Sequence, residues 1–238
     1  MMIKRLKRQK CVALLMDPDN YAPGDVINIK GIDSPHRPDF VFIGGSLTGV
    51  HPDELILKVK EITDIPVVLF PGSLLQLSNK ADMLLLLSLI SGRNPELLIG
   101  NHVVAAPHIK NMSIDIVPTG YILIACGAKT SVEYMSQTDA IPASKIDIAV
   151  ATAMAGEMLG LKLIYLEGGS GAAHPVPADM ISAVSKALDV PLVVGGGLRS
   201  ADSIKDAFNA GADMLVLGNG CQDDPGLLEA ACKIRDDL

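Results

Sequence analysis

Eight short apolar runs, spread along the chain and separated by helical or polar segments, constrain the fold more than any other feature. The runs cover residues 12–16, 40–43, 67–70, 83–87, 121–124, 163–166, 192–194 and 214–217. Each is bounded by Gly, Pro or Asp and is apolar without alternation, which is typical of parallel strands buried on both faces. Eight such strands with helices between them predict an α/β fold, a (β/α)8 TIM barrel.

The segments between the runs supply the helices of this barrel, with one irregular interval. Helical patterns cover residues 52–62, 144–159, 177–188, 201–210 and 225–235. About twelve residues separate the third and fourth runs, roughly the shortest length in which a crossover can include its helix. We therefore expect a modified barrel whose third helix is shortened or missing. We find no linker or low-complexity stretch, so residues 1–238 are expected to form a single domain.

Composition narrows the class of partner and the compartment. The formal net charge is −7, which argues against nucleic acid and allows at most peripheral membrane contact. Five cations within residues 4–10 precede an apolar run too short for a signal peptide, so we expect a basic first helix. The run at 84–90 is too short to span a bilayer. The four cysteines do not have the spacing of metal ligands. We expect them to be reduced thiols, as in a cytoplasmic protein.

Three glycine-rich turns follow the last three predicted strands and indicate a phosphate site. They are EGGSG at 167–171, GGG at 195–197 and GNG at 218–220. Glycine lets backbone N–H groups approach an anion, and many TIM barrels bind phosphate in the loops after strands seven and eight. Arg199 and Ser200 open the following helix, whose N-terminus adds positive potential. The alternative is that these glycines only permit tight turns.

A carboxylate, Asp17, follows the first strand and faces the same end of the barrel. Mg²⁺ commonly uses one or two carboxylates, water and substrate phosphate oxygens, so Asp17 could hold it, with the Ser46 hydroxyl after strand two as a further ligand. Alternatively, Asp17 and Asp19 only cap the next helix through a turn. Spacing alone leaves both readings open. The histidines share no metal spacing, and Cys126 reads better as an apolar filler than as a site residue.

Six motifs, in order along the chain, resemble those of the geranylgeranylglyceryl phosphate synthases, a family that includes the bacterial heptaprenylglyceryl phosphate synthases. The motifs are LLMDPD at 14–19, FIGGS at 42–46, VVLFPGS at 67–73, YLEGGSG at 165–171, VGGGLRS at 194–200 and LVLGNG at 215–220. The resemblance implies a Mg²⁺-dependent prenyltransferase that joins sn-glycerol 1-phosphate to a long prenyl diphosphate in ether-lipid synthesis. It also implies a homo-oligomer.

The same resemblance assigns the site residues. Asp17 and Ser46 match the metal site. The glycerol 1-phosphate site matches Tyr165, Leu166, Glu167, Gly168, Gly169, Ser170, Gly171, Gly196, Gly197, Gly218 and Asn219. Glu167 is the acidic group within these turns, and we expect it to orient the glycerol hydroxyl and take its proton, while Tyr165 orients the glycerol.

The length of the prenyl tail is less constrained. Some relatives carry a Trp where Glu96, Leu97 and Leu98 stand here, in what we expect to be the loop after strand four. We expect geranylgeranyl diphosphate as the best substrate and longer chains, such as heptaprenyl, as the alternative. Two other classes stay open: a phosphate-binding isomerase or cyclase, which needs a proton-transfer pair or a Schiff-base lysine, and a non-catalytic isoprenoid or phosphate binder.

Overall fold

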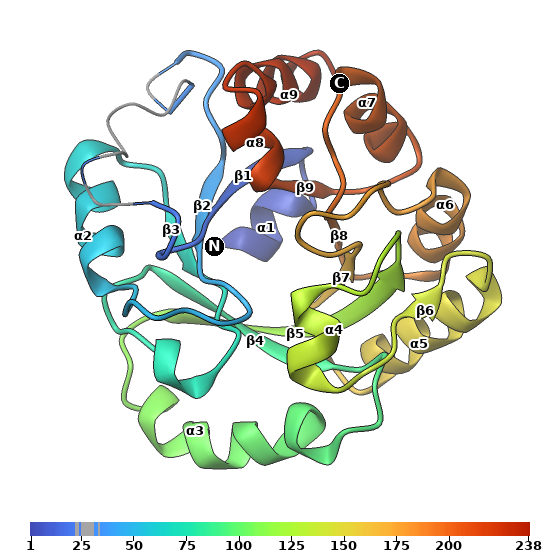
Figure 1. Ribbon diagram of the computed structural model, residues 1–238, viewed down its shortest axis with the longest axis horizontal. Coiled ribbons are helices and arrows are strands. Elements are labelled where there is room, and N and C mark those ends of the chain that lie inside the picture. The colour runs from blue at the N-terminus through green and yellow to red at the C-terminus, as the bar shows by residue number, and fades with distance from the viewer. Residues whose placement is uncertain (22–23, 25–30, 33) are drawn as a thin grey trace.

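Parallel strands close into a barrel in the computed structural model, which describes residues 1–21, 24, 31–32 and 34–238 (Figure 1). The barrel strands are β1 (Cys11–Met16), β2 (Phe40–Ile43), β3 (Val67–Leu69), β4 (Met83–Leu89), β5 (Asp115–Ala125), β7 (Leu163–Glu167), β8 (Leu192–Gly195) and β9 (Met214–Leu217). Their order is β4-β3-β2-β1-β9-β8-β7-β5, and a β4–β5 pairing closes the ring. This confirms the predicted eight-stranded TIM barrel. The two-residue β6 (Ile141–Pro142) pairs with the end of β5.

Helices form a ring around the strands (Figure 1). The five predicted helices are α2 (Asp53–Ile62), α5 (Ile146–Met158), α6 (Ala178–Ala187), α7 (Ala201–Asn209) and α9 (Leu227–Asp236). Between β3 and β4 the structure has only a 3-10 turn, η2 (Leu74–Gln76), as expected for a lost third helix. Leucine side chains at this gap are therefore left without a covering helix.

Four further helices complete the described part of the chain: α1 (Met2–Leu6), α3 (Asn101–Ile109), α4 (Ser131–Ser136) and α8 (Asn219–Asp223). The basic first helix is present as predicted. The placing of residues 96–98 in a loop was wrong, because they lie in a π-helical turn, η3 (Glu96–Gly100), that continues into α3. Helix α4 follows β5 and helix α8 follows β9, so both lie at the carboxyl ends of the barrel strands.

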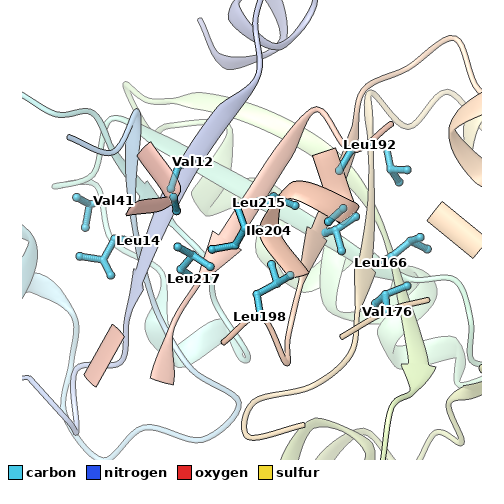
Figure 2. Packing of buried hydrophobic residues seen from close by; sticks show 14 of the residues in the cluster. Val12, Leu14, Val41, Leu166, Val176, Leu192, Leu198, Ile204, Leu215 and Leu217 are labelled. Carbon is cyan, nitrogen blue, oxygen red and sulfur yellow. The ribbon is translucent and has the colours of Figure 1, made fainter. Parts of the chain in front are cut away.

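Two apolar clusters hold the barrel together. Between the strands and the helices lie Val12, Leu14, Leu166, Leu215 and Leu217, shown with their neighbours in Figure 2. The second cluster fills the barrel interior and includes Phe40, Phe42 and Tyr165. Met2 and Leu6 of α1 belong to this interior cluster. Helix α1 therefore closes one end of the barrel and leaves the other end open.

The closed end is the amino end of the strands. Arg5 of α1 and Arg235 of α9 both bond to the buried carboxylate of Asp39, which directly precedes β2. The same carboxylate accepts a hydrogen bond from the Val12 backbone N–H at 2.9 Å. Lys10 pairs with Asp213, which precedes β9, at 3.3 Å. Substrates must therefore enter at the carboxyl ends of the strands.

Candidate active site

A cavity of about 760 Å³ opens at the carboxyl ends of the strands. Most of the residues that the sequence assigned to a site line it: Asp17, Ser46, Tyr165, Glu167, Gly169, Ser170, Gly171, Gly196, Gly197, Gly218 and Asn219. They come from the ends of β1, β2, β7, β8 and β9. A single space thus brings the predicted metal residues and the predicted phosphate turns together.

Leu166 and Gly168 are the two predicted site residues that do not line this cavity. Successive side chains of a strand point to opposite faces. Leu166 therefore points away from Tyr165 and Glu167, and it packs in the outer core, as Figure 2 shows. Gly168 lies against Cys126, whose sulfur a Cβ at Gly168 would approach to 3.3 Å. A ligand in this cavity could therefore contact Leu166 only through the backbone.

Glu167 is the last residue of β7, and its carboxylate is buried inside the barrel mouth. The Gly169 N–H donates to Oε1 at 2.6 Å, and the side chains of Tyr121 and Tyr165 hydrogen-bond to the same carboxylate. Burial raises the pKa of Glu167 above its ordinary value, and these three hydrogen bonds oppose that rise. The carboxylate is therefore fixed in position and more basic than a glutamate in water.

Tyr121 is a functional neighbour that the sequence analysis missed. It lies opposite Tyr165 in the β5–β7 register, and the two rings meet edge to face at 5.3 Å. Phe70 stacks on Tyr165 at 5.5 Å. Burial and the nearby Glu167 hold the pKa of both phenols well above the ordinary tyrosine value, so they remain hydrogen-bond donors to Glu167. The strand register could have signalled Tyr121, because it is the inward residue beside Tyr165.

The glycines of the second turn are required by close contact. At Gly196, with φ of +86°, a Cβ would lie 2.6 Å from the Gly169 nitrogen and 2.8 Å from Glu167 Oε1. At Gly197, with φ of +70°, a Cβ would lie 2.2 Å from the His174 carbonyl oxygen. Only glycine fits both conditions. The turns after β7 and β8 therefore pack directly on each other beside the Glu167 carboxylate.

The third turn leads from β9 into α8, which begins at Asn219. The loops after the seventh and eighth barrel strands, together with a short extra helix, are the usual phosphate position in TIM barrels. Gly196, Gly197, Gly218 and Asn219 occupy this position here. The geometry thus favours the phosphate reading of the turns over a role confined to chain reversal.

Asp17 is half-buried at the cavity edge. Its Oδ1 accepts the Asp19 N–H at 3.0 Å, and its Oδ2 lies so close to Gly45 that a Cβ there would be 2.6 Å away. Burial is the main cause that raises the pKa of Asp17. Asp19 instead accepts from the Gly49 and Val50 N–H groups, so it ties two loops together.

The donor set at this edge suits a hard cation. A carboxylate oxygen of Asp17 lies close to the Gly45 backbone, and the Ser46 hydroxyl is one residue further along the same loop. In the described part of the chain, no three His, Cys, Asp or Glu side chains cluster as a metal site. A bound Mg²⁺ would therefore depend on Asp17, Ser46, water and substrate oxygens, which is a common arrangement for this ion.

Two cations, Lys129 and Arg199, line the same cavity. Lys129 pairs with Asp139 at 3.4 Å and Arg199 with Asp223 at 3.6 Å, and all four side chains are at least half exposed. A Schiff-base lysine needs desolvation to lower its pKa. Lys129 is solvated and ion-paired, so it does not support the Schiff-base form of the isomerase or cyclase alternative.

A second cavity, of about 440 Å³, adjoins the first. The two share lining residues, among them Ser46, Phe70, Tyr121 and Met135. Beyond these, the second cavity is lined mainly by leucines: Leu74, Leu75, Leu77, Leu84, Leu85, Leu86, Leu87, Leu89 and Leu97. It lies at the gap left by the lost third helix. Leu97 lines it, whereas Glu96 and Leu98 do not.

Comparison with known proteins places the chain in a family. A family model described as the PcrB family matches residues 4–234. The chain belongs to the PcrB family. A geranylgeranylglyceryl phosphate synthase of Chitinophaga pinensis is 46% identical over 95% of this chain and 90% of its own length. One of Thermococcus gammatolerans is 37% identical over 99% and 93%, respectively. As a member of this family, the protein is an enzyme of the prenyltransferase class.

Solved structures agree with the family. The chain resembles (S)-3-O-geranylgeranylglyceryl phosphate synthase of Thermoplasma acidophilum, solved with sn-glycerol-1-phosphate, with a TM-score of 0.92 and 30% identity over 100% of this chain and 97% of that one. An N-acetylmannosamine-6-phosphate 2-epimerase of Clostridium perfringens, 13% identical with a TM-score of 0.56, shares the fold alone. No helix of the described residues combines the length and the apolar character needed to cross a membrane.

Proposed function

We propose that this PcrB-family member joins sn-glycerol 1-phosphate to geranylgeranyl diphosphate and releases diphosphate in a Mg²⁺-dependent reaction. The observation that carries the proposal is the pair of adjoining cavities, one lined by glycine turns and the other by leucines. A phosphate suits the first and a polyisoprene tail the second. The shared wall at Ser46, Phe70 and Tyr121 brings the two reacting ends together.

The turns after β7, β8 and β9 hold the phosphate of glycerol 1-phosphate, and Glu167 faces the one of its two free hydroxyls that reacts. Holding both substrates in one site replaces a bimolecular encounter. The hydroxyl oxygen forms a bond to the allylic carbon, the bond from that carbon to the diphosphate oxygen breaks, and the hydroxyl proton passes to Glu167. Tyr121 and Tyr165 hydrogen-bond to the Glu167 carboxylate and keep it oriented, so Tyr165 acts on Glu167 and not on the glycerol as the sequence analysis expected.

Asp17 after β1 and Ser46 after β2 would hold the Mg²⁺ ion in the same cavity. Bound Mg²⁺ supplies positive charge to the departing diphosphate oxygens. The relatives named as synthases of the geranylgeranyl compound support the twenty-carbon tail. The chain's own Leu97, in place of a bulkier ring, supports tolerance of longer tails such as heptaprenyl.

Binding of the two substrates to separate cavities can be measured directly. Titration calorimetry with sn-glycerol 1-phosphate, in the presence and absence of a non-reactive prenyl diphosphate analogue, is expected to show that both bind at once. Mutual exclusion would contradict the two-cavity assignment.

We also propose a homo-oligomer, supported by apolar side chains on the outer face of α5. Met158 and Leu159 are each 79% exposed, and Ile148 is also exposed. Exposed apolar patches of this kind mark interfaces. Light scattering is expected to give a multiple of 25.0 kDa at micromolar protein, and the Met158→Glu variant is expected to lower it. Leu57→Glu, at an exposed leucine of α2, serves as control. A wild-type mass near 25.0 kDa would contradict the proposal.

A further inference from the structure

Four large apolar side chains line the two cavities and at the same time stand in solvent. They are Leu47 in the loop after β2, Leu75 in η2, and Tyr134 and Met135 in α4. Leu75 is 86% exposed and Tyr134 76% exposed. Leu47 and Met135 line both cavities, Leu75 lines the second and Tyr134 the first. These four residues, from three segments at the carboxyl ends of the strands, form an apolar rim.

The part of the apolar rim beside the lost helix is held in place by a buried amide. Gln76, next to Leu75 in η2, donates from Nε2 to the Gly45 carbonyl oxygen at 2.8 Å and accepts the Gly72 N–H at 3.2 Å. The Gly45 contact ties η2 to the loop that carries Leu47. The turn therefore keeps its position although no helix covers it, and Leu75 stays outside the core.

Helix α4 is anchored in a similar way. The Thr130 N–H donates to Glu133 Oε2 at 2.8 Å in a capping box. A Cβ at Gly169 would lie 2.3 Å from Thr130 Cγ2, so the start of α4 packs on the turn after β7. Tyr134 and Met135 follow on the exposed side of this helix. Clustered apolar side chains that anchored segments hold in water mark an interaction surface.

The proposed substrate indicates what covers this surface. A prenyl tail of twenty carbons partitions strongly into a lipid bilayer, so the substrate comes to the enzyme from a membrane. A second copy of the chain on the apolar rim would cover the exposed edge of both cavities, whereas a bilayer supplies the tail there. A tyrosine, with an apolar ring and a polar tip, suits the membrane interface. The formal net charge of −7 disfavours electrostatic attraction to an anionic surface.

We propose that the apolar rim docks on a lipid bilayer, so that the prenyl tail passes from the membrane into the leucine-lined cavity without crossing water. Docking buries the exposed leucines of the rim in the acyl region, and the binding strength follows the apolar area that is buried. The contact needs no anionic lipid. This inference rests on the proposed function, because it takes the second cavity as the tail site.

A single indole can report the contact, because the chain contains no tryptophan. Phosphatidylcholine vesicles are added to Leu75→Trp in the absence of substrate. We expect the emission to move to shorter wavelength and to be quenched when the lipids are brominated near the headgroup. Leu57→Trp, at an exposed leucine of α2 that lines neither cavity, is the matched control and is expected to show neither change. Unchanged emission from Leu75→Trp would overturn the proposal.

Vesicle flotation measures the strength of the contact. The wild type is expected to float with phosphatidylcholine vesicles at low and at high salt. The double variant Leu47→Glu, Leu75→Glu is expected to bind at least about tenfold more weakly, and Leu57→Glu to bind as the wild type does. Wild-type protein that does not float, flotation that salt abolishes, or an equal loss in Leu57→Glu would overturn the proposal.

Light scattering on the same variants tests the rival occupant, a second copy of the chain. We expect the double variant to keep the wild-type mass, and a lower mass would assign the apolar rim to an interface between copies and overturn the proposal. Failure of the proposed function is distinguishable, because the vesicle measurements contain no substrate. That failure appears as missing product in detergent solution whether or not the protein binds vesicles.

Discussion

At the scale of single residues, the site combines one buried carboxylate and one half-buried carboxylate with different tasks. Glu167 is enclosed by two phenols and a backbone N–H, whereas Asp17 lies at the cavity edge near Ser46. In the proposed reaction, enclosure fixes Glu167 as the base, and partial exposure leaves Asp17 open to a cation. The two environments are consistent with a base and a metal ligand in a single cavity.

Glu167→Gln is expected to lower the single-turnover rate by roughly 10²–10⁴, the range typical of a general base. The amide keeps the shape of the side chain and removes its basicity. Because burial raises the pKa of Glu167, wild-type activity should fall as the pH drops through a value above the usual glutamate range. The variant should lack this acid limb. A near-normal single-turnover rate would remove Glu167 from the role of base.

Asp17→Asn is expected to abolish turnover and to change the affinity for glycerol 1-phosphate by less than about twofold, since a lost metal ligand affects the leaving group and not the glycine turns. Calorimetry with glycerol 1-phosphate and a turnover assay on the same preparation check both parts. Asp19→Asn, next to it but bonded to a loop, serves as the control. A comparable loss of glycerol phosphate affinity would place Asp17 in the other subsite.

At the scale of elements, the lost helix between β3 and β4 leaves the leucine-lined cavity that we propose as the tail site. The short spacing between the third and fourth runs predicted this loss, and η2 is all that remains there. Leu97 of η3 lines the resulting cavity at the end nearer the mouth. On the proposed function, we therefore expect the helical segment that follows β4 to limit the length of the prenyl tail.

Leu97→Trp is expected to reduce activity on thirty-five-carbon substrates at least about tenfold relative to twenty-carbon ones, because an indole narrows an apolar pocket without touching the phosphate turns. Competition assays with mixed chain lengths measure the ratio. Ile99→Trp, exposed on the same turn, is the matched control. An equal loss across all chain lengths would place the tail along another wall.

The sequence predicted the barrel strands well where continuous apolar runs marked them. It placed the start of β5 at Tyr121, six residues late, because Pro118 and Gly120 interrupt a strand that begins at Asp115. It missed α3, since Gly100 and Pro107 disguise the helical pattern. In both cases the tertiary structure overrides the local propensity of the residues. The hydrogen bonds of Tyr121 and the pairing of Gln76 with Gly45 depend on contacts across elements, which no local pattern encodes.

At the scale of the whole molecule, catalysis and stability are separated between the two ends of the barrel. The open end carries the cavities. The closed end is tied by the buried Asp39, which joins α1, β1 and α9. This division is usual for TIM barrels.

Asp39→Ala is expected to lower the free energy of unfolding by about 3 kcal/mol, because it leaves two arginines and a backbone N–H without their shared partner. Urea denaturation monitored by circular dichroism measures the change. Glu61→Ala removes only an exposed pair with Lys58 and is expected to have little effect. Equal stability of the two variants would show that the network at the closed end contributes nothing.

The most direct test of the account is transfer of radiolabelled sn-glycerol 1-phosphate into an organic-extractable product. With geranylgeranyl diphosphate and Mg²⁺, we expect label in the organic phase. We expect none when Mg²⁺ is chelated or when Glu167→Gln replaces the wild type at short reaction times. Label that stays in the aqueous phase with wild-type enzyme, Mg²⁺ and prenyl diphosphates of twenty to thirty-five carbons would contradict the account.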